Sequence, residues 1–178
     1  MSKFGHMTRK IWMLPVAAMA VVAVALALPF GGAASAQGVV KSVHEDWQIR
    51  CQTPAGAQTE QCALFSRVVA EDRANVGITV MVLKSADQKA RLLRVLVPEK
   101  ILLPPGLGLT IDEVNVGKIP YRTCGTLGCL AEVGIDDALL KQLSTGTTAT
   151  FIIYLDEQEG VGFPVSLKGF ATGYDKLK

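Results

Sequence analysis

The chain has 178 residues, of which 49% are apolar, and a net charge of +2 at neutral pH. This length suits one domain, or one domain with an appendage. The near-neutral charge argues against a nucleic-acid-binding protein, which carries a basic stripe, and the apolar content argues against a disordered chain.

The first 36 residues have the organisation of a secretory signal peptide. Three basic residues precede an apolar stretch over 11–30, and Ala34-Ser35-Ala36 then supplies a small-residue cleavage motif. This pattern predicts export, with cleavage between Ala36 and Gln37. Twenty mostly apolar residues can also span a bilayer, so a retained membrane anchor is the alternative. Without residues 1–36 the chain keeps 15 basic and 16 acidic residues, a net charge of −1.

After cleavage we expect a flexible leader over 37–44 and one β-rich domain over 45–178. Trp47–Cys51 alternates apolar and polar residues, which is the pattern of a half-buried strand. Turn residues follow, and a second extended pattern begins at Cys62. If Cys51 and Cys62 face each other in a hairpin, Ile49 lies opposite Leu64, and the register of both strands is fixed.

Four cysteines follow the export segment, an even number in an oxidising compartment. Three pairings are possible, and we favour the local one, Cys51 with Cys62 and Cys124 with Cys129. The alternative is redox or metal chemistry. Four residues separate Cys124 from Cys129, however, where redox pairs have two, and His44 is the one histidine left to complete a zinc site.

Trp47 is the single tryptophan after residue 36. Alternation places it on the same strand face as Ile49 and Cys51, so we expect it to be buried against the first disulfide. A lone tryptophan can also be an exposed anchor for a binding partner, and this is the alternative interpretation.

The middle of the chain has β-branched and apolar runs over 77–83 and 91–97, the second ended by Pro98. A basic cluster around them is interpreted as a solvated face: Lys84, Lys89, Arg91 and Arg94. Next, residues 101–112 form two apolar runs around Pro104-Pro105-Gly106. These runs are either two core strands or a partly exposed apolar tip that meets a partner or lipid.

Toward the C-terminus, Lys118–Thr123 and Cys129–Ile135 are predicted to form a hairpin around the small cystine loop. Asp136 or Asp137 is expected to cap a helix that runs through Leu143 and ends at Gly146. Further predicted elements are strands at 149–155 and 163–167 and a closing turn or short helix at 169–177. About eight short strands with frequent turn signals predict a mainly β fold. We expect an antiparallel β-sandwich or barrel-like domain with one or two short helices.

The residue types used in catalysis occur here in positions that favour structural roles. His44 stands near the leader, Asp136 and Asp137 stand where helix caps belong, and Asp156, Glu157 and Glu159 stand in a predicted hairpin turn. The sequence therefore predicts no catalytic residues, no cofactor and no metal site.

Five motifs, in their order and spacing, resemble the invasion-associated locus B family of exported proteins of Gram-negative bacteria. They are Asp46–Cys51, Glu60–Cys62, Leu102–Gly106 leading to Ile111-Asp112, Cys124 with Gly128-Cys129, and Val165–Phe170. The resemblance covers nearly the whole chain after the export segment. It implies a β-rich, non-enzymatic envelope or secreted protein, linked in some pathogens to entry into host cells.

The sequence thus favours a periplasmic protein that contacts a protein partner in the envelope or on a host cell. Secretion and association with the outer membrane are the alternative locations. No nucleic acid and no membrane span after cleavage are expected. The alternatives are a periplasmic carrier that holds an apolar ligand between its sheets and an exported thiol-redox protein that uses Cys124 and Cys129.

Overall fold

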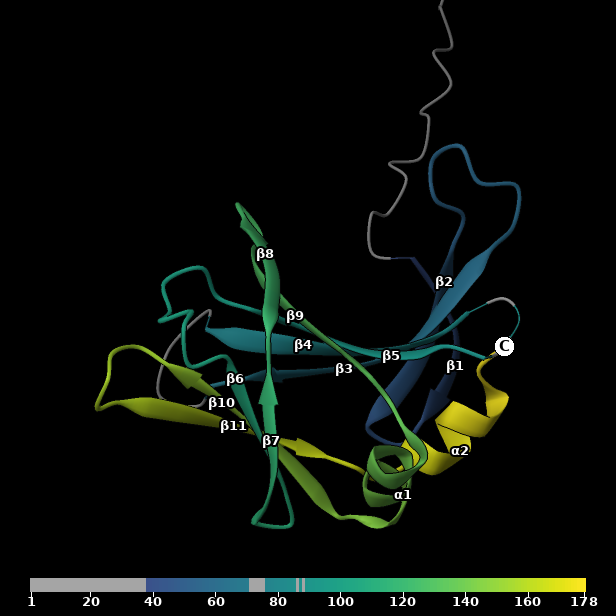
Figure 1. Ribbon diagram of the computed structural model, residues 1–178. Helices are drawn as coiled ribbons and strands as arrows, with labels where there is room; N and C mark the ends of the chain where they lie inside the picture. Colours follow the sequence, from purple (N-terminus) through teal and green to yellow (C-terminus); the bar gives the residue numbers. More distant parts are fainter. Residues whose placement is uncertain (1–37, 71–75, 86, 88) are drawn as a thin grey trace, which may run out of the picture. The chain divides into compact units, whose positions relative to one another are not determined.

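Alternating apolar and polar residues build two antiparallel sheets in this protein (Figure 1). The computed structural model describes residues 38–70, 76–85, 87 and 89–178, which belong to one compact unit. The predicted export segment and its cleavage position, Ala36 to Gln37, lie outside the described residues. No helix in the described part is long and apolar enough to cross a membrane.

The larger sheet has seven strands in the order β1-β2-β3-β4-β5-β9-β8, each antiparallel to its neighbours. Their bounds are β1 Val39–His44, β2 Trp47–Gln52, β3 Gln61–Val69, β4 Gly77–Lys84, β5 Arg91–Val97, β8 Tyr121–Gly125 and β9 Gly128–Gly134. Cys51 pairs with Cys62 and Ile49 with Leu64, which is the register expected from the first two cysteines.

The smaller sheet has four strands in the order β11-β10-β6-β7. They are β6 Leu107–Ile111, β7 Val114–Ile119, β10 Thr148–Tyr154 and β11 Gly160–Ser166. This sheet and both helices lie on one side of strands β3, β4 and β5 (Figure 1). The mainly β, antiparallel sandwich with two short helices confirms the predicted fold class, and the described part contains eleven strands where about eight were expected.

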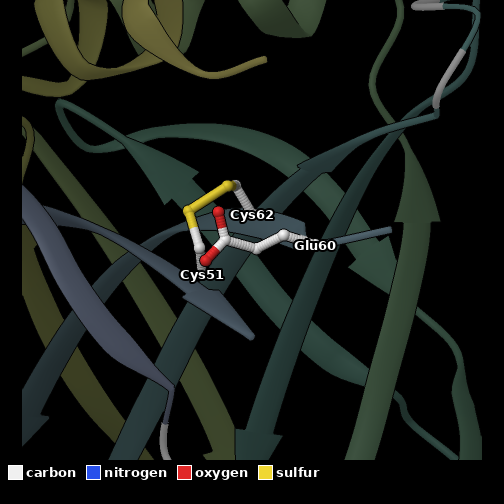
Figure 2. Close-up of side chains that lie close together, drawn as sticks. All are labelled: Cys51, Glu60 and Cys62. Carbon is white, nitrogen blue, oxygen red and sulfur yellow. A yellow bond between two sulfur atoms is a disulfide. The ribbon is translucent and has the colours of Figure 1, made fainter. Parts of the chain in front are cut away.

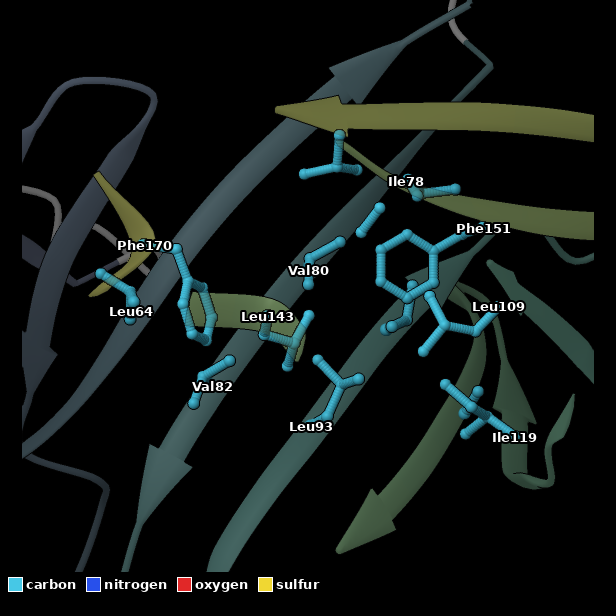
Figure 3. Packing of buried hydrophobic residues seen from close by; sticks show 14 of the residues in the cluster. Leu64, Ile78, Val80, Val82, Leu93, Leu109, Ile119, Leu143, Phe151 and Phe170 are labelled. Carbon is cyan, nitrogen blue, oxygen red and sulfur yellow. The ribbon is translucent and has the colours of Figure 1, made fainter. Parts of the chain in front are cut away.

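The core fills the space between the two sheets. Figure 3 shows side chains from both, among them Val80, Leu93, Leu109 and Phe151, gathered in one layer. Trp47, Phe151, Phe163 and Phe170 are the largest of the fully buried side chains. The described side chains fill the space between the two sheets. A carrier of an apolar ligand would hold its ligand in that same space.

Two helices border this core. Helix α1, Asp137–Thr145, begins after Asp136, whose carboxylate accepts a hydrogen bond from the Leu139 N–H at 2.7 Å, and it ends at Gly146, as the sequence predicts. Helix α2, Phe170–Lys176, is the predicted closing segment. Gly169 precedes it with φ 82°, and a Cβ there would lie 2.0 Å from the His44 carbonyl oxygen. The close approach of α2 to the end of β1 therefore requires glycine.

Residues 39–44 correct the prediction of a flexible leader over 37–44. They form β1, which pairs with β2 from Val39 opposite Cys51 to His44 opposite Trp47, with a bulge between Val40 and Ser42. An edge strand is held by backbone hydrogen bonds and needs few core side chains. Its exposed valines therefore gave no burial pattern that the sequence could reveal.

Two further strand predictions were partly wrong. The segment 118–123 is not one strand, because Pro120 separates the end of β7 in the small sheet from β8 in the large sheet. Proline lacks the N–H that a continuous ladder needs. Likewise, residues 101–103 form no strand, and Leu103 is exposed, whereas Leu107 and Leu109 lie in the core as part of β6. The second half of the apolar segment is thus core, whereas in the first half Ile101 packs against the edge of the core and Leu103 is exposed.

Candidate functional site

The first cysteine pair brings three potential metal ligands together. The sulfur atoms of Cys51 and Cys62 and a carboxylate oxygen of Glu60 lie within 4.8 Å of one another (Figure 2). The two sulfurs are bonded to each other, however, and Glu60 forms an ion pair with Lys41 at 2.9 Å. A metal would need thiolates, so in this disulfide form the cluster is a covalent staple between β2 and β3.

The second staple closes the β8–β9 hairpin. Cys124 and Cys129 are directly paired across the two strands and bonded to each other, so both disulfides follow the local pairing that the sequence favours. Gly128 has φ 123°, and a Cβ there would lie 2.1 Å from the Val97 carbonyl oxygen. The tip of this hairpin carries Leu127, whose side chain is 86% exposed.

The acidic residues and the histidine singled out from the sequence do not converge, and those other than Glu157 have structural partners. His44 contacts the Ser42 hydroxyl at 2.9 Å, and Asp136 caps α1. The Asp156 carboxylate accepts hydrogen bonds from the backbone N–H groups of Gln158 and Glu159, and these bonds lower the pKa of Asp156. Asp137 pairs with Arg91 at 2.8 Å, and Glu157 is exposed in the β10–β11 turn.

The predicted basic cluster is split between two faces. The Lys84 ammonium group donates to the carbonyl oxygens of Tyr174 and Leu177 in the C-terminal segment, at 2.8 and 3.0 Å. Arg91 reaches α1, whereas Arg94 pairs with Glu132 on the opposite face of the large sheet. These residues therefore do not form one solvated patch.

A surface hollow of about 500 Å³ lies where β7 passes into β8, lined by Leu103–Gly106 and Lys118–Tyr121. The Tyr121 hydroxyl is buried and has no hydrogen-bond partner among the described residues. Burial, with a smaller contribution from Tyr154, raises the pKa of Tyr121 to about 12. The hollow is open to solvent, and Lys118 and Tyr121 are the titratable residues in its lining.

The outward face of the large sheet is the strongest candidate site. It carries three apolar pairs, each formed by residues directly opposite on neighbouring strands: Phe65 with Met81, Leu83 with Leu92, and Leu96 with Leu130. Opposed residues on one sheet face are in contact range, so the pairs extend an apolar surface over β3, β4, β5 and β9. We call these six residues the outer apolar patch. All six are half-buried, and none packs against the core cluster.

Arginines lie within this patch and around it. The Arg50 guanidinium lies 5.7 Å from the centre of the Phe65 ring, and it donates twice to the Gln48 side-chain oxygen, at 3.2 and 3.0 Å. Arg94 lies between Leu92 and Leu96 on β5, where it pairs with Glu132, and Arg122 lies 3.7 Å from the same carboxylate. Arg67 follows Phe65 on β3 and is exposed. The Arg94–Glu132 ion pair therefore lies within the patch, between the Leu83–Leu92 and Leu96–Leu130 pairs, and Arg50, Arg67 and Arg122 lie at its edges.

The family model described as invasion associated locus B (IalB) protein matches residues 47–178. The chain belongs to the invasion-associated locus B family. Two curated relatives, the invasion protein B homologues of Brucella abortus strain 2308 and of biovar 1 strain 9-941, are each 28% identical over 157 residues. The match covers 88% of this chain and 86% of each relative. The crystal structure of invasion associated protein B from Bartonella henselae has the same fold, with a TM-score of 0.66 and 21% identity over 79% of this chain and 95% of that one.

The IalB match covers every strand of the outer apolar patch but begins after β1. Sequence reasoning placed Arg94 in a solvated cluster and missed the patch altogether. A signal was present in β4 and β5, which carry large apolar residues on both faces instead of alternating strictly between apolar and polar. Near-continuous apolar strands are typical of sheets that are covered on both faces.

Proposed function

We propose that this IalB-family protein is an exported, non-catalytic protein of the bacterial envelope that acts through protein contacts made by its outer apolar patch. The composition of β4 and β5 is the observation that carries the proposal. Both strands are built as if covered on two sides, yet no described helix or strand covers their outward face. Large apolar side chains gathered on an outward face among charged groups are characteristic of an interaction site.

This proposal includes export to the periplasm. Secretion and association with the outer membrane are alternative final locations. Two disulfides and the N-terminal pattern support it, because disulfides persist in oxidising compartments. We expect the mature protein to begin at Gln37 and to be recovered with the periplasmic fraction. N-terminal sequencing of the cellular protein tests this, and a product that retains residues 11–28 would contradict it.

A role in host-cell invasion is the more specific form of the proposal, and the names of the Brucella and Bartonella proteins support it. A strain that lacks this chain should enter cultured host cells less often than a strain complemented with the intact gene. Equal entry by both strains would confine the proposal to an envelope function.

Site-specific photocrosslinking tests the protein contact. We would place a benzophenone amino acid at Leu96, in the outer apolar patch, and as a control at Gln142, which is exposed on α1. Irradiation of intact cells should convert the Leu96 protein, and not the Gln142 protein, to a discrete species of higher mass that protease removes. Equal adducts at both positions, or no protein adduct at Leu96, would refute the contact.

A further inference from the structure

We propose that the partner of the outer apolar patch is an acidic amphipathic helix of another protein, whose apolar stripe covers the patch and whose carboxylates pair with the surrounding arginines. This inference rests on the proposed function and adds the chemistry of the partner. It is drawn from the distribution of arginine, from the charge of the face and from its dimensions.

Arginine and lysine are sharply separated in this structure. Four of the five described arginines lie on the outward face of the large sheet: Arg50, Arg67, Arg94 and Arg122. None of the described outward positions of β2, β3, β4, β5 and β9 is a lysine. A face that only had to be soluble could use either residue. Arginine, together with methionine and aromatic residues, is instead enriched in protein interfaces, where lysine is depleted.

The geometry of Arg50 suits a protein carboxylate. Its ring contact with Phe65 and its two hydrogen bonds to Gln48 hold the planar guanidinium at the edge of the patch. A guanidinium can bind a carboxylate through two parallel hydrogen bonds while it stacks on an aromatic ring. Because Arg50 is already held in place, little side-chain freedom remains to be lost when the partner binds.

The charge of the face decides between possible occupants. Four arginines and one glutamate, Glu132, give this face a net charge of +3, whereas residues 37–178 together have a net charge of −1. Two copies of the protein that met through this face would bring like charges together, which is unfavourable. An anionic partner is complementary, and Arg50 and Arg67 have no carboxylate partner within the described part of the chain.

The dimensions of the patch suit a helix. The patch extends over four neighbouring strands, about 14 Å across at the usual strand spacing. An α-helix with its side chains is about 10–12 Å wide, so one helix laid on these strands would cover the apolar pairs and place its flanking residues near the arginines.

Binding of synthetic peptides to the mature protein, measured by fluorescence anisotropy, tests the partner's chemistry. Three 18-residue amphipathic peptides serve as probes: one with leucine and glutamate faces, one with leucine and lysine faces, and one in which serine replaces the leucines of the first. We expect the Leu/Glu peptide to bind at least tenfold more tightly than either of the others. Equal affinity for the Leu/Lys peptide would overturn the proposal.

Matched variants locate the binding. The triple variant Arg50→Gln, Arg67→Gln, Arg122→Gln should bind the Leu/Glu peptide at least tenfold more weakly. Replacing the same three residues with lysine should restore only part of the affinity. The control is the triple variant Lys141→Gln, Lys168→Gln, Lys176→Gln, which removes the same charge at exposed positions away from the patch. It should bind the Leu/Glu peptide like the wild type. If both glutamine triples lose affinity equally, the effect is general electrostatics and the inference is wrong.

Three further outcomes show whether this inference fails alone or together with the proposed function. The protein could bind phosphatidylglycerol vesicles through its arginines and not bind the Leu/Glu peptide. This result would identify the face as a membrane-binding surface and would overturn both the proposed protein contact and the acidic-helix inference. A protein crosslinked through Leu96 that has no acidic amphipathic helix at the crosslinked segment would overturn the partner chemistry alone. Concentration-dependent dimerisation that is abolished by Met81→Ser would instead identify a second copy as the occupant, and it would likewise refute the acidic helix.

Discussion

Trp47 joins the two sheets of the sandwich. Its side chain is 1% exposed, its indole N–H donates to the Ser166 carbonyl oxygen at the end of β11 at 2.9 Å, and Phe170 meets its ring edge-on at 5.1 Å. Burial was predicted from alternation along β2. The ring partner was not, because Phe170 comes from the far end of the chain and only folding brings it to β2.

Truncation of Trp47 should therefore be severe. We expect Trp47→Ala to lower the free energy of unfolding by about 3–5 kcal/mol, since it leaves a large cavity in the core. Urea denaturation of the mature protein measures this loss, and Trp47→Phe, which keeps most of the ring volume, should lose less. Water-like tryptophan emission from the native protein that iodide quenches fully would show that Trp47 is on the surface.

The Tyr121 hydroxyl of the native protein is expected to ionise only at high pH. Its pKa is raised to about 12 from 10.0, so between these values the unfolded chain ionises at this residue while the native chain stays neutral. The native state then binds more protons than the unfolded state. The contribution of Tyr121 to stability is thus complete below pH 10 and is lost as the pH rises to about 12.

Absorbance at 295 nm measures this titration. The native protein should show a tyrosinate component with a midpoint near 12 that is absent from Tyr121→Phe. Unfolding in urea should move the component back toward 10. A Tyr121→Phe profile that keeps the component near 12 would assign it to another tyrosine.

At the scale of elements, Lys84 ties β4 to helix α2. Its ammonium group donates to two carbonyl oxygens of the C-terminal segment and lies 4.1 Å from the centre of the Tyr174 ring. The last carbonyls of a helix have no partners within the helix, and a cation near them is favourable. Burial lowers the pKa of Lys84, although Asp175 opposes this shift.

Replacing Lys84 with methionine should loosen α2 without disturbing the sheet. The variant keeps a long side chain and loses the hydrogen bonds, so we expect the free energy of unfolding to fall by about 1–2 kcal/mol. Hydrogen exchange should accelerate in residues 170–177 and remain unchanged in β4 and β5. Unchanged exchange at the C-terminus would show that the tie is unimportant.

Local sequence signals were sufficient for two elements of the fold. Helix α1 follows from local signals, the Asp136 cap and the Gly146 stop, and the first hairpin follows from the two cysteines that fix its register. Strand β1 was missed because its exposed valines give no burial pattern, although its partner β2 is the next strand in the chain. The division at Pro120 was missed because the local pattern does not show that β7 pairs with β6 in one sheet and β8 with β9 in the other. Hydrophobic alternation reports burial of side chains and carries little information on edge strands, which are held through the backbone.

At the scale of the whole molecule, neighbouring leucines on β5 should respond differently to truncation. Leu93 points into the core and is 0% exposed, whereas Leu92 belongs to the outer apolar patch. Leu93→Ala should cost about 2–5 kcal/mol, and Leu92→Ala about 1 kcal/mol or less. Denaturation of both variants measures the difference. Equal losses would mean that the outward face is covered within the monomer.

The sequence by itself determined the elements governed by near neighbours: the local cysteine pairing, the cap and end of α1, the alternation of β2 and the five motifs that mark the IalB family. Only the tertiary structure decided which face of the large sheet is filled by the other sheet and which is left to the outer apolar patch. The physical reason lies in β4 and β5. A strand that is apolar on both faces fits two partners equally well, and its sequence does not say which partner belongs to the same chain.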